Sequence, residues 1–324
     1  MAQRGLSYRF DGARYHIDGH RGEASFGDLL KWQFNGKRAR WPRWVENRHY
    51  PPPPERVTGS DMCLTWIGHS AVLVQAAGLN ILTDPFLSPR ASPTPWAGPK
   101  RVRPPGLAAE DMPPLDLVLV SHNHYDHLDL PALTEISRHH KPRVVTPKGN
   151  ARLIAKANRS LRIDELDWHE GVGAGAARIT VTPAFHWSKR TAFDTNQALW
   201  GAFVVETDAG SIYFAGDTGF GDGVSFREIR RRYGAPRLSL LPIGAYEPRW
   251  FMKPQHMNPD DAAEAHQLLE SRTSLAIHHG TIQLTDEAID APPKALAQAL
   301  AARKIDPHSF LVPDIGETIS IPWG

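Results

Sequence analysis

Short apolar runs separated by turn residues dominate the chain from about residue 61 onward. Runs at 64–67, 71–75 and 80–83 are broken by Gly68-His69 and by Gly78, which predicts a meander of β-strands. Similar runs predict further strands at 117–120, 143–146, 179–184, 202–206, 212–215, 238–241, 275–277 and 318–321.

Segments between these runs predict helices at 130–138, 149–157, 225–233, 259–271 and 292–303. Residues 85–114 contain nine prolines and are expected to form a long ordered loop. The strands fall into two groups with helices interspersed. We therefore expect an α/β protein with two mixed β-sheets covered by helices.

The first 58 residues differ from the rest of the chain. Tryptophans and a phenylalanine alternate there with lysines and arginines, and four consecutive prolines at 51–54 predict an extended connector. This segment is either an arm packed over the main domain, with arginine stems on aromatic rings, or an interfacial anchor at a membrane surface. Because no long amphipathic period is evident, we favour the packed arm. We divide the chain into a Trp/Arg-rich arm with a Pro-rich connector, 1–58, and one domain, 59–324.

Composition narrows the chemistry available to the chain. The 324 residues include 37 basic and 35 acidic ones, so there is no general field for polyanions and nucleic acid is not expected as a partner. Cys63 is the single cysteine, which excludes a disulfide framework and a Cys-ligated zinc finger. Any metal must therefore be held by carboxylates and by some of the 16 histidines.

The start of the sequence lacks the apolar stretch of a secretory signal peptide. No segment approaches the ~18 uninterrupted apolar residues of a membrane span. We expect a cytoplasmic protein that is soluble or peripheral to a membrane, and a lipid substrate stays compatible with this expectation.

Residues 122–127 read His-Asn-His-Tyr-Asp-His and place four potential metal ligands in six positions, after the apolar run 117–120. Ligands on a loop at the end of a buried strand are typical of an open, catalytic metal site. His122 and His124 are two apart, so both imidazoles point the same way and share one ion. Asp126 and His127 are adjacent and are expected to diverge, which suits a second ion a short distance away.

Further ligands follow later strands. His186, Asp217 and His278 each end an apolar run, where the loops of a sandwich converge. Singly, each has an ordinary explanation as a polar residue at a strand end or in a turn. Together, they predict one metal centre at one edge of the sheets.

The order His-x-His-x-Asp-His, then a His, an Asp and a final His, resembles the metallo-β-lactamase fold superfamily. Longer motifs resemble one branch of it, the N-acylphosphatidylethanolamine-hydrolysing phospholipases D. They include Trp66-Ile-Gly-His-Ser-Ala, Leu82-Thr-Asp-Pro, His186-Trp-x-Lys-Arg-Thr and Leu241-Pro-Ile-Gly-Ala-Tyr-Glu-Pro-Arg-Trp-Phe-Met-Lys. The resemblance covers about 64–316 and implies an αββα four-layer sandwich with a dinuclear metal site, commonly zinc, so that 59–324 would be a metallo-β-lactamase-like catalytic domain.

The resemblance assigns roles by motif position. The first metal would be held by His122, His124 and His186, the second by Asp126, His127 and His278, and Asp217 would bridge both. Asp84 either orients a ligand imidazole or is a turn residue before proline. For His69, in its Gly-His-Ser turn, a plain turn residue is the preferred interpretation. His279 stands where the family has tryptophan, which leaves two candidates for the last ligand, of which we choose His278.

The implied chemistry is phosphodiester hydrolysis. Two divalent ions ~3.5–4 Å apart activate a water and stabilise an in-line displacement. We expect two Zn²⁺ from the imidazole content, with other divalent transition metals left open. Asp217 and His256 are the expected catalytic residues, His256 as an acid. Tyr125 and His256 are expected to bind the substrate, and Trp250 and Phe251 either line an apolar approach or lie in the core.

The expected reaction cleaves N-acylphosphatidylethanolamine to an N-acylethanolamine and phosphatidic acid. The alternative is a soluble phosphodiester or sugar-phosphate lactone on the same fold. The segment 149–157 is polar and basic, whereas its counterpart in the animal enzymes is apolar and is thought to dip into the membrane. Peripheral membrane contact and a homodimer therefore both stay open, and a noncatalytic scaffold is disfavoured by the full ligand set.

Overall fold

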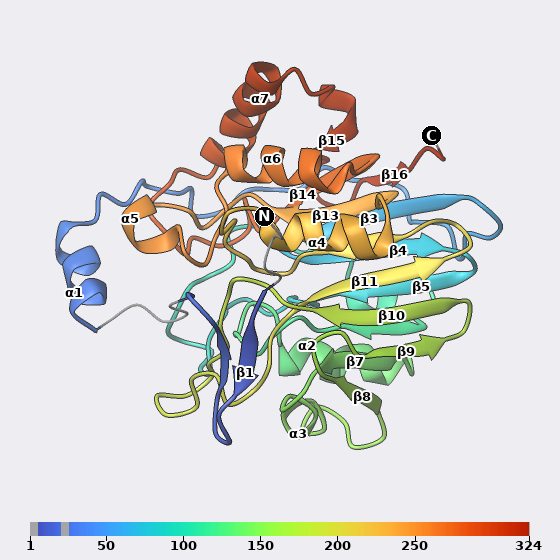
Figure 1. Ribbon diagram of the computed structural model, residues 1–324. Helices are drawn as coiled ribbons and strands as arrows, with labels where there is room; N and C mark the ends of the chain where they lie inside the picture. Colours follow the sequence, from blue (N-terminus) through green and yellow to red (C-terminus); the bar gives the residue numbers. More distant parts are fainter. Residues whose placement is uncertain (1–5, 21–25, 324) are drawn as a thin grey trace.

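The computed structural model describes residues 6–20 and 26–323, in which two seven-stranded sheets are stacked face to face and flanked by helices (Figure 1). The first sheet has the order β16-β3-β4-β5-β6-β7-β8. Its strands, in that order, are Thr318–Ser320, Met62–Gly68, Ala71–Ala76, Leu79–Thr83, Leu117–Leu119, Arg143–Pro147 and Arg162–Leu166.

The second sheet has the order β15-β14-β13-β12-β11-β10-β9. Its strands, in that order, are Phe310–Leu311, Thr273–Ile277, Leu238–Pro242, Ile212–Phe214, Ala202–Thr207, Ala177–Thr182 and Gly171–Ala174. Both sheets are mixed: β5 to β8 and β12 to β15 pair in parallel, and the remaining neighbours are antiparallel. A separate hairpin of β1 (Tyr8–Phe10) and β2 (Tyr15–Ile17) precedes them.

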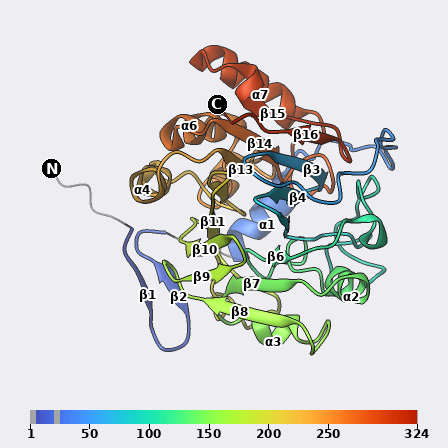
Figure 2. The ribbon, with the colours of Figure 1, turned by 90° about the vertical axis from the view of Figure 1, so that its right-hand side faces the viewer.

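Helices complete the outer layers. The helices α4 (Val224–Tyr233), α6 (Pro259–Leu269) and α7 (Ala291–Arg303) pack together on the side of the second sheet, with α6 against β13. On the side of the first sheet lie α2 (Leu130–His139) and the short α3 (Ala151–Ile154). Figure 2 shows the resulting layers from the end at which β16 lies. The predicted αββα sandwich is confirmed.

The central strands are buried on both faces, which is why they read as continuous apolar runs. On β4, Val72 and Val74 face the core between the sheets, whereas Ala71 and Leu73 face the core under α2 and α3. Caps fix where helices begin: Asp129 accepts from the Ala132 N–H at the start of α2, and Asn258 forms a capping box at the start of α6.

In the two seven-stranded sheets, the strands that sequence patterns missed are β8, β9 and β15, which all lie at sheet edges; the hairpin of β1 and β2 was missed as well. An edge strand is half solvated, so it lacks the apolar run of a central one; β8 exposes Glu165 and β9 contains Gly171 and Gly173. The predicted helix at 149–157 shortens to α3, and 85–114 forms the expected loop, with a 3-10 turn at Ala109–Asp111 and isolated β-bridges from Arg90 to Lys100 and from Arg101 to Ile282.

The N-terminal segment contains an unpredicted helix, α1 (Phe26–Asn35), and contacts the main body of the protein. The Trp32 indole N–H donates to Asp286 Oδ1 at 3.0 Å, and the Arg38 guanidinium lies 4.8 Å from the Trp32 ring centroid. The Trp41 indole donates to the Glu287 carbonyl at 2.8 Å. These contacts agree with the packed-arm interpretation, and residues 51–54 run extended.

None of the described helices has both the length and the apolar content that a bilayer-crossing segment requires.

Candidate metal centre

The predicted ligands come from strand ends that share one edge of the sandwich. The strands β10, β12 and β14 point the same way in the second sheet, because β10 and β12 are each antiparallel to β11 and β12 to β14 pair in parallel. Their carboxyl ends lead to His186, Asp217 and His278. In the first sheet β6 leads to residues 122–127. All seven predicted ligands lie within four clusters of side chains that are linked through shared residues, and all seven are buried except His124, which is partly exposed.

Three histidines form what we call the three-imidazole group: His122, His124 and His186. His124 Nδ1 lies 2.8 Å from His122 Nε2 and 3.2 Å from His186 Nε2. The far nitrogens of two rings are anchored: His122 Nδ1 lies 2.9 Å from Ser121 Oγ, and His186 Nδ1 donates to the Gln255 carbonyl at 3.1 Å. This anchoring leaves the His186 Nε2 lone pair facing the group, as a metal ligand requires.

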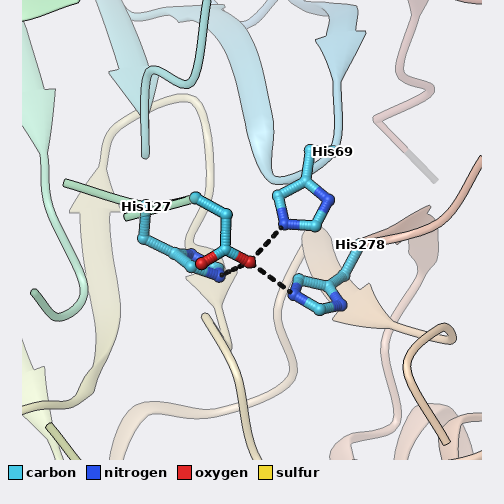
Figure 3. A group of neighbouring side chains, drawn as sticks. His69, His127 and His278 are labelled. Carbon is cyan, nitrogen blue, oxygen red and sulfur yellow. Dashed lines mark hydrogen bonds and ion pairs between the residues drawn. The ribbon is translucent and has the colours of Figure 1, made fainter. Parts of the chain in front are cut away.

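The remaining ligands form the carboxylate group: Asp126, His127, Asp217 and His278. Asp217 Oδ2 lies 3.2 Å from His127 Nε2 and 3.1 Å from His278 Nε2. Asp126 Oδ2 lies 3.5 and 3.6 Å from the same two nitrogens (Figure 3). Asp217 Oδ2 is also 3.8 Å from His186 Nε2, so this carboxylate lies between the two groups.

The expectation that Asp126 and His127 diverge is wrong. Both side chains face the same group, because residues 124–128 form a turn rather than an extended strand. In that turn the His127 and Leu128 amides donate to the His124 carbonyl. The expected common direction of His122 and His124 agrees with their 2.8 Å contact.

Asp84 helps to orient ligands of both groups. Its carboxylate is fully buried and accepts from His127 Nδ1–H at 2.6 Å, from the Ser121 amide at 2.7 Å and from the Ser121 hydroxyl at 2.5 Å. The turn-residue interpretation of Asp84 is therefore incomplete, since the side chain holds one ligand directly and reaches His122 through Ser121.

His69 is the site residue that sequence reasoning misjudged. Its ring is 1% exposed, its Nε2 lies 3.0 Å from Asp126 Oδ2, and its centroid is 4.1 Å from that of His278 (Figure 3). His69, Asp84 and His278 all adopt positive φ, of 56°, 26° and 61°. Such backbone geometry in residues other than glycine gathers at functional sites. The apolar strand end before Gly68-His69 was the one available signal.

The two groups differ in charge. Burial lowers the pKa of His122 well below its usual value, and burial lowers those of His124 and His186 to about 3. Burial also acts on the carboxylate group, but there Asp217 and Asp126 outweigh it, hold the pKa of His127 well above its usual value and raise that of His278 to about 9. The pKa values of both carboxyls stay well below their usual range despite burial, because His127 lies beside them.

Unsatisfied buried atoms test whether a cation fits. His127 Nε2, His278 Nε2 and Asp217 Oδ1 are buried and form no hydrogen bond, although the two nitrogens lie 3.2 and 3.1 Å from the other carboxylate oxygen, Asp217 Oδ2. A buried polar atom without a hydrogen bond destabilises the fold by about 1–3 kcal/mol. A shared cation would bind these atoms and so explains why they are buried together. Imidazole and carboxylate donors without thiolate fit zinc and related divalent ions. These histidines and aspartates therefore form a candidate metal-binding cluster.

A cavity of about 380 Å³ opens over both groups. Its floor includes ligands and the predicted substrate contacts Tyr125 and His256. Its wall is mainly apolar and contains Leu29, Trp32, Ala91, Phe251, Met252 and Leu284. Phe251 thus lines the approach, whereas Trp250 is half-exposed beside a neighbouring hollow.

The environment of His256 limits its chemistry. Its Nδ1 lies 4.0 Å from Asp217 Oδ2, and burial lowers its pKa to about 3, so the ring is neutral near neutral pH. Tyr125 donates its hydroxyl to the Arg190 carbonyl at 3.1 Å, and the Arg190 guanidinium lies 4.0 Å from the Tyr125 ring centroid. Arg190 entered the sequence analysis only as part of the motif His186-Trp-x-Lys-Arg-Thr, without a role, and Gln255 was given no role there.

The positions of the two imidazole rings favour His278, rather than His279, as the last predicted ligand. His278 Nε2 faces the carboxylate group, whereas the His279 ring packs on Trp66 with centroids 4.7 Å apart. The tight approach between neighbouring loops here depends on Gly244, where a Cβ would lie 2.1 Å from the His278 carbonyl oxygen.

Comparisons with known proteins agree with this geometry. The family model described as a beta-lactamase superfamily domain matches residues 79–279. N-acyl-phosphatidylethanolamine-hydrolyzing phospholipase D 1 of Caenorhabditis elegans is 41% identical over 270 residues, which are 80% of this chain and 75% of the relative. The mitochondrial protein of the same description from Saccharomyces cerevisiae is 35% identical over 85% of this chain, which spans 59% of the yeast protein.

A solved structure shares the fold. A metallo hydrolase from the archaeon Ignicoccus hospitalis superposes with a TM-score of 0.59 over 81% of this chain and 99% of the archaeal one, at 23% identity.

Proposed function

The chain belongs to the metallo-β-lactamase superfamily, with relatives named for the hydrolysis of N-acylphosphatidylethanolamine, and on this premise we propose that it is a phospholipase D-type phosphodiesterase. It is a metal-dependent hydrolase of that fold. The proposed reaction breaks the bond between phosphorus and the ethanolamine oxygen of N-acylphosphatidylethanolamine. Water supplies the oxygen that joins phosphorus and the proton that the leaving oxygen takes up, so the products are phosphatidic acid and an N-acylethanolamine.

The observation that carries the proposal is the composition of the cavity. A wall of Leu29, Trp32, Phe251, Met252 and Leu284 stands beside a floor of histidines and aspartates. A lipid phosphodiester has the same two parts, an anionic phosphate and adjoining acyl chains. A sugar-phosphate lactone or soluble phosphodiester offers nothing for such a wall to bind, which weighs against the alternative substrate.

The ligand assignment forms part of the proposal. His122, His124 and His186 would hold one zinc ion, Asp126, His127 and His278 a second, and Asp217 both. When bound, two such ions neutralise the nonbridging phosphate oxygens and activate the attacking water. The arm, 1–58, would then complete a catalytic domain at 59–324, because Leu29 and Trp32 close one side of its cavity.

The chain's own polar residues bind and orient the substrate. His256 lies over Asp217 as a neutral ring, so we assign it as a hydrogen-bond donor to the leaving oxygen rather than as an imidazolium acid. Tyr125 is held by Arg190, lines the same cavity and is assigned to the head group.

The test uses zinc-loaded protein of measured metal content and N-acylphosphatidylethanolamine in detergent micelles. Release of N-acylethanolamine, with ¹⁸O from labelled water found in phosphatidic acid, is the expected result. A fully loaded protein that releases none, or that hydrolyses a lactone or a cyclic nucleotide instead, refutes the proposal. His256→Gln should lower turnover and leave metal content unchanged.

A further inference from the structure

We propose that the apolar rim around the cavity mouth is a surface that docks on a phospholipid bilayer. The rim consists of six exposed side chains: Leu29, Leu30, Phe34, Trp96, Phe193 and Trp250. This inference rests on the proposed function, because docking would bring the cavity to its lipid substrate.

The degree of exposure first distinguishes the rim. Phe34 and Phe193 are 83% exposed and Trp96 is 77% exposed, more than any other large hydrophobic side chain in the described ranges 6–20 and 26–323. Single exposed apolar residues are common, but several of the largest around one opening mark an interaction site.

Each rim residue is connected to the cavity through its own segment. On α1, Leu29 and Trp32 line the cavity while Leu30 and Phe34 face outward. On α5 (Arg249–Met252), Phe251 and Met252 line the cavity and Trp250 is half-exposed. In Figure 1 both helices project from the same end of the sandwich, opposite to β16.

Two loops bring the other rim residues. Trp96 lies at the tip of a loop whose two ends, Ala91 and Pro99, line the cavity and are joined by a backbone hydrogen bond of 3.1 Å. Phe193 lies at the tip of the loop that follows Trp187, another lining residue, and Arg190 ties this loop to Tyr125. The rim therefore consists of separate exposed tips on segments that also line the opening.

Exposed lysines accompany the apolar tips. Lys31 lies 4.7 Å from the Trp250 ring centroid, Lys37 lines the adjoining hollow, Lys100 follows Pro99, and Lys253 follows α5. Tryptophan and phenylalanine beside lysine are typical of segments that lie in the headgroup region, where the rings enter the acyl boundary and the ammonium groups meet phosphates. Positive charge there favours anionic lipid.

A bilayer suits this rim better than a protein partner does. A protein seated on these tips would close the cavity to its substrate, whereas a bilayer supplies the substrate through the same opening. The surface also differs from the apolar segment of the resembling animal enzymes, because the corresponding α3 region exposes Arg152 and Lys156.

Vesicle flotation with the zinc-loaded full chain, on vesicles that contain no N-acylphosphatidylethanolamine, tests docking without hydrolysis of the proposed substrate. We expect binding to phosphatidylcholine vesicles, tighter binding when phosphatidylglycerol is included, and weakening by salt. The double variant Phe34→Asp/Phe193→Asp should lower the bound fraction at least tenfold. Trp323→Asp is the matched control, since Trp323 is 50% exposed and follows β16 at the opposite end.

The outcomes separate docking from catalysis. Hydrolysis of substrate in detergent micelles measures the proposed function, and the double variant should retain it, because neither residue lines the cavity. Wild type that does not float with vesicles, or equal flotation of wild type and double variant, overturns docking even if micellar hydrolysis is intact. A dimer in sedimentation that Phe34→Asp dissociates would assign the rim to self-association and equally overturn it.

Discussion

The three-imidazole group and the carboxylate group share one cavity but bind protons in opposite ways. Burial is the largest influence on His124 and His186 and lowers the pKa of each to about 3, so both rings are neutral near neutral pH and can bind a cation. In the carboxylate group, Asp126 and Asp217 instead hold protons on His127 and His278. A cation entering there must first displace those protons. The three-imidazole group is therefore ready to bind a metal ion. In the carboxylate group, ion pairs between the histidines and aspartates must first be broken.

Removing the carboxylate between the groups should have the largest effect. Asp217→Asn is expected to lower kcat/KM by more than about a hundredfold, because loss of a ligand exceeds the 10–100-fold typical of residues that only orient one. Metal analysis should show less than the full complement per chain. Asp222→Asn, a change of an exposed carboxylate on the next turn, should alter neither quantity. Unchanged metal content in Asp217→Asn would contradict the bridging role.

Asp84 and Ser121 allow the groups to be weakened separately. Asp84→Asn replaces the carboxylate that accepts from His127 Nδ1–H with a neutral amide and should lower the affinity of the carboxylate group by about 10–100-fold. Ser121→Ala removes the hydroxyl beside His122 Nδ1 and one hydrogen bond to Asp84, but it leaves the contact between Asp84 and His127, so it should lower mainly the affinity of the three-imidazole group, and by a smaller factor. Competitive titration against a chelator, with Co²⁺ absorption to distinguish the sites, measures both. Equal losses at both sites in Ser121→Ala would refute the separation.

The pH dependence of metal uptake follows from the opposite pKa shifts. Below the raised pKa of His278, about 9, the apparent affinity of the carboxylate group should rise about tenfold per pH unit for each proton displaced. The three-imidazole group, with its lowered pKa values, should show no such slope between about pH 6 and pH 8. Calorimetry in buffers of different ionisation enthalpy counts the protons released. Two parallel slopes would contradict the comparison.

Substitution of His69 should have the smallest effect on metal affinity, and only in the carboxylate group. His69→Asn keeps a residue that tolerates positive φ but removes the contact with Asp126 Oδ2. We expect a loss of up to about tenfold in the affinity of the carboxylate group, near the lower limit for an orienting residue. His169→Asn is matched to it, since His169 also has positive φ, of 67°, and lies outside the metal-binding cluster. A change at the three-imidazole group would show a wider role.

The sequence predicts those parts of the fold in which apolar residues form regular runs. Central strands can be predicted because both of their faces are apolar. The ligands at their ends can be predicted from the direction in which each strand runs. The edge strand β9 could not be found this way, since its glycines and half-solvated face leave no run of apolar residues. The same holds for α1, whose Leu30 and Phe34 face outward instead of into a core.

Within the site, sequence patterns place His122 and His186 but not the contacts that orient them. His69 lies in a turn that is distant in sequence from Asp126, and only the stacking of two sheets brings the rings of His69 and His278 together. Arg190 is comparable: its backbone and side chain hold Tyr125, a relation that no spacing along the chain encodes. Long-range contacts of this kind need the tertiary fold.

The ligands reach the centre from both sheets, since residues 122–127 follow β6 and the other three follow β10, β12 and β14. Bound ions would therefore fasten the first half of the polypeptide to the second by coordinate bonds. At a free metal concentration a hundred times the dissociation constant, each ion adds about 2.7 kcal/mol against unfolding. A shortage of metal would therefore lower the catalytic rate and also shorten the lifetime of the protein, because the less stable metal-free fold is more easily degraded by proteases.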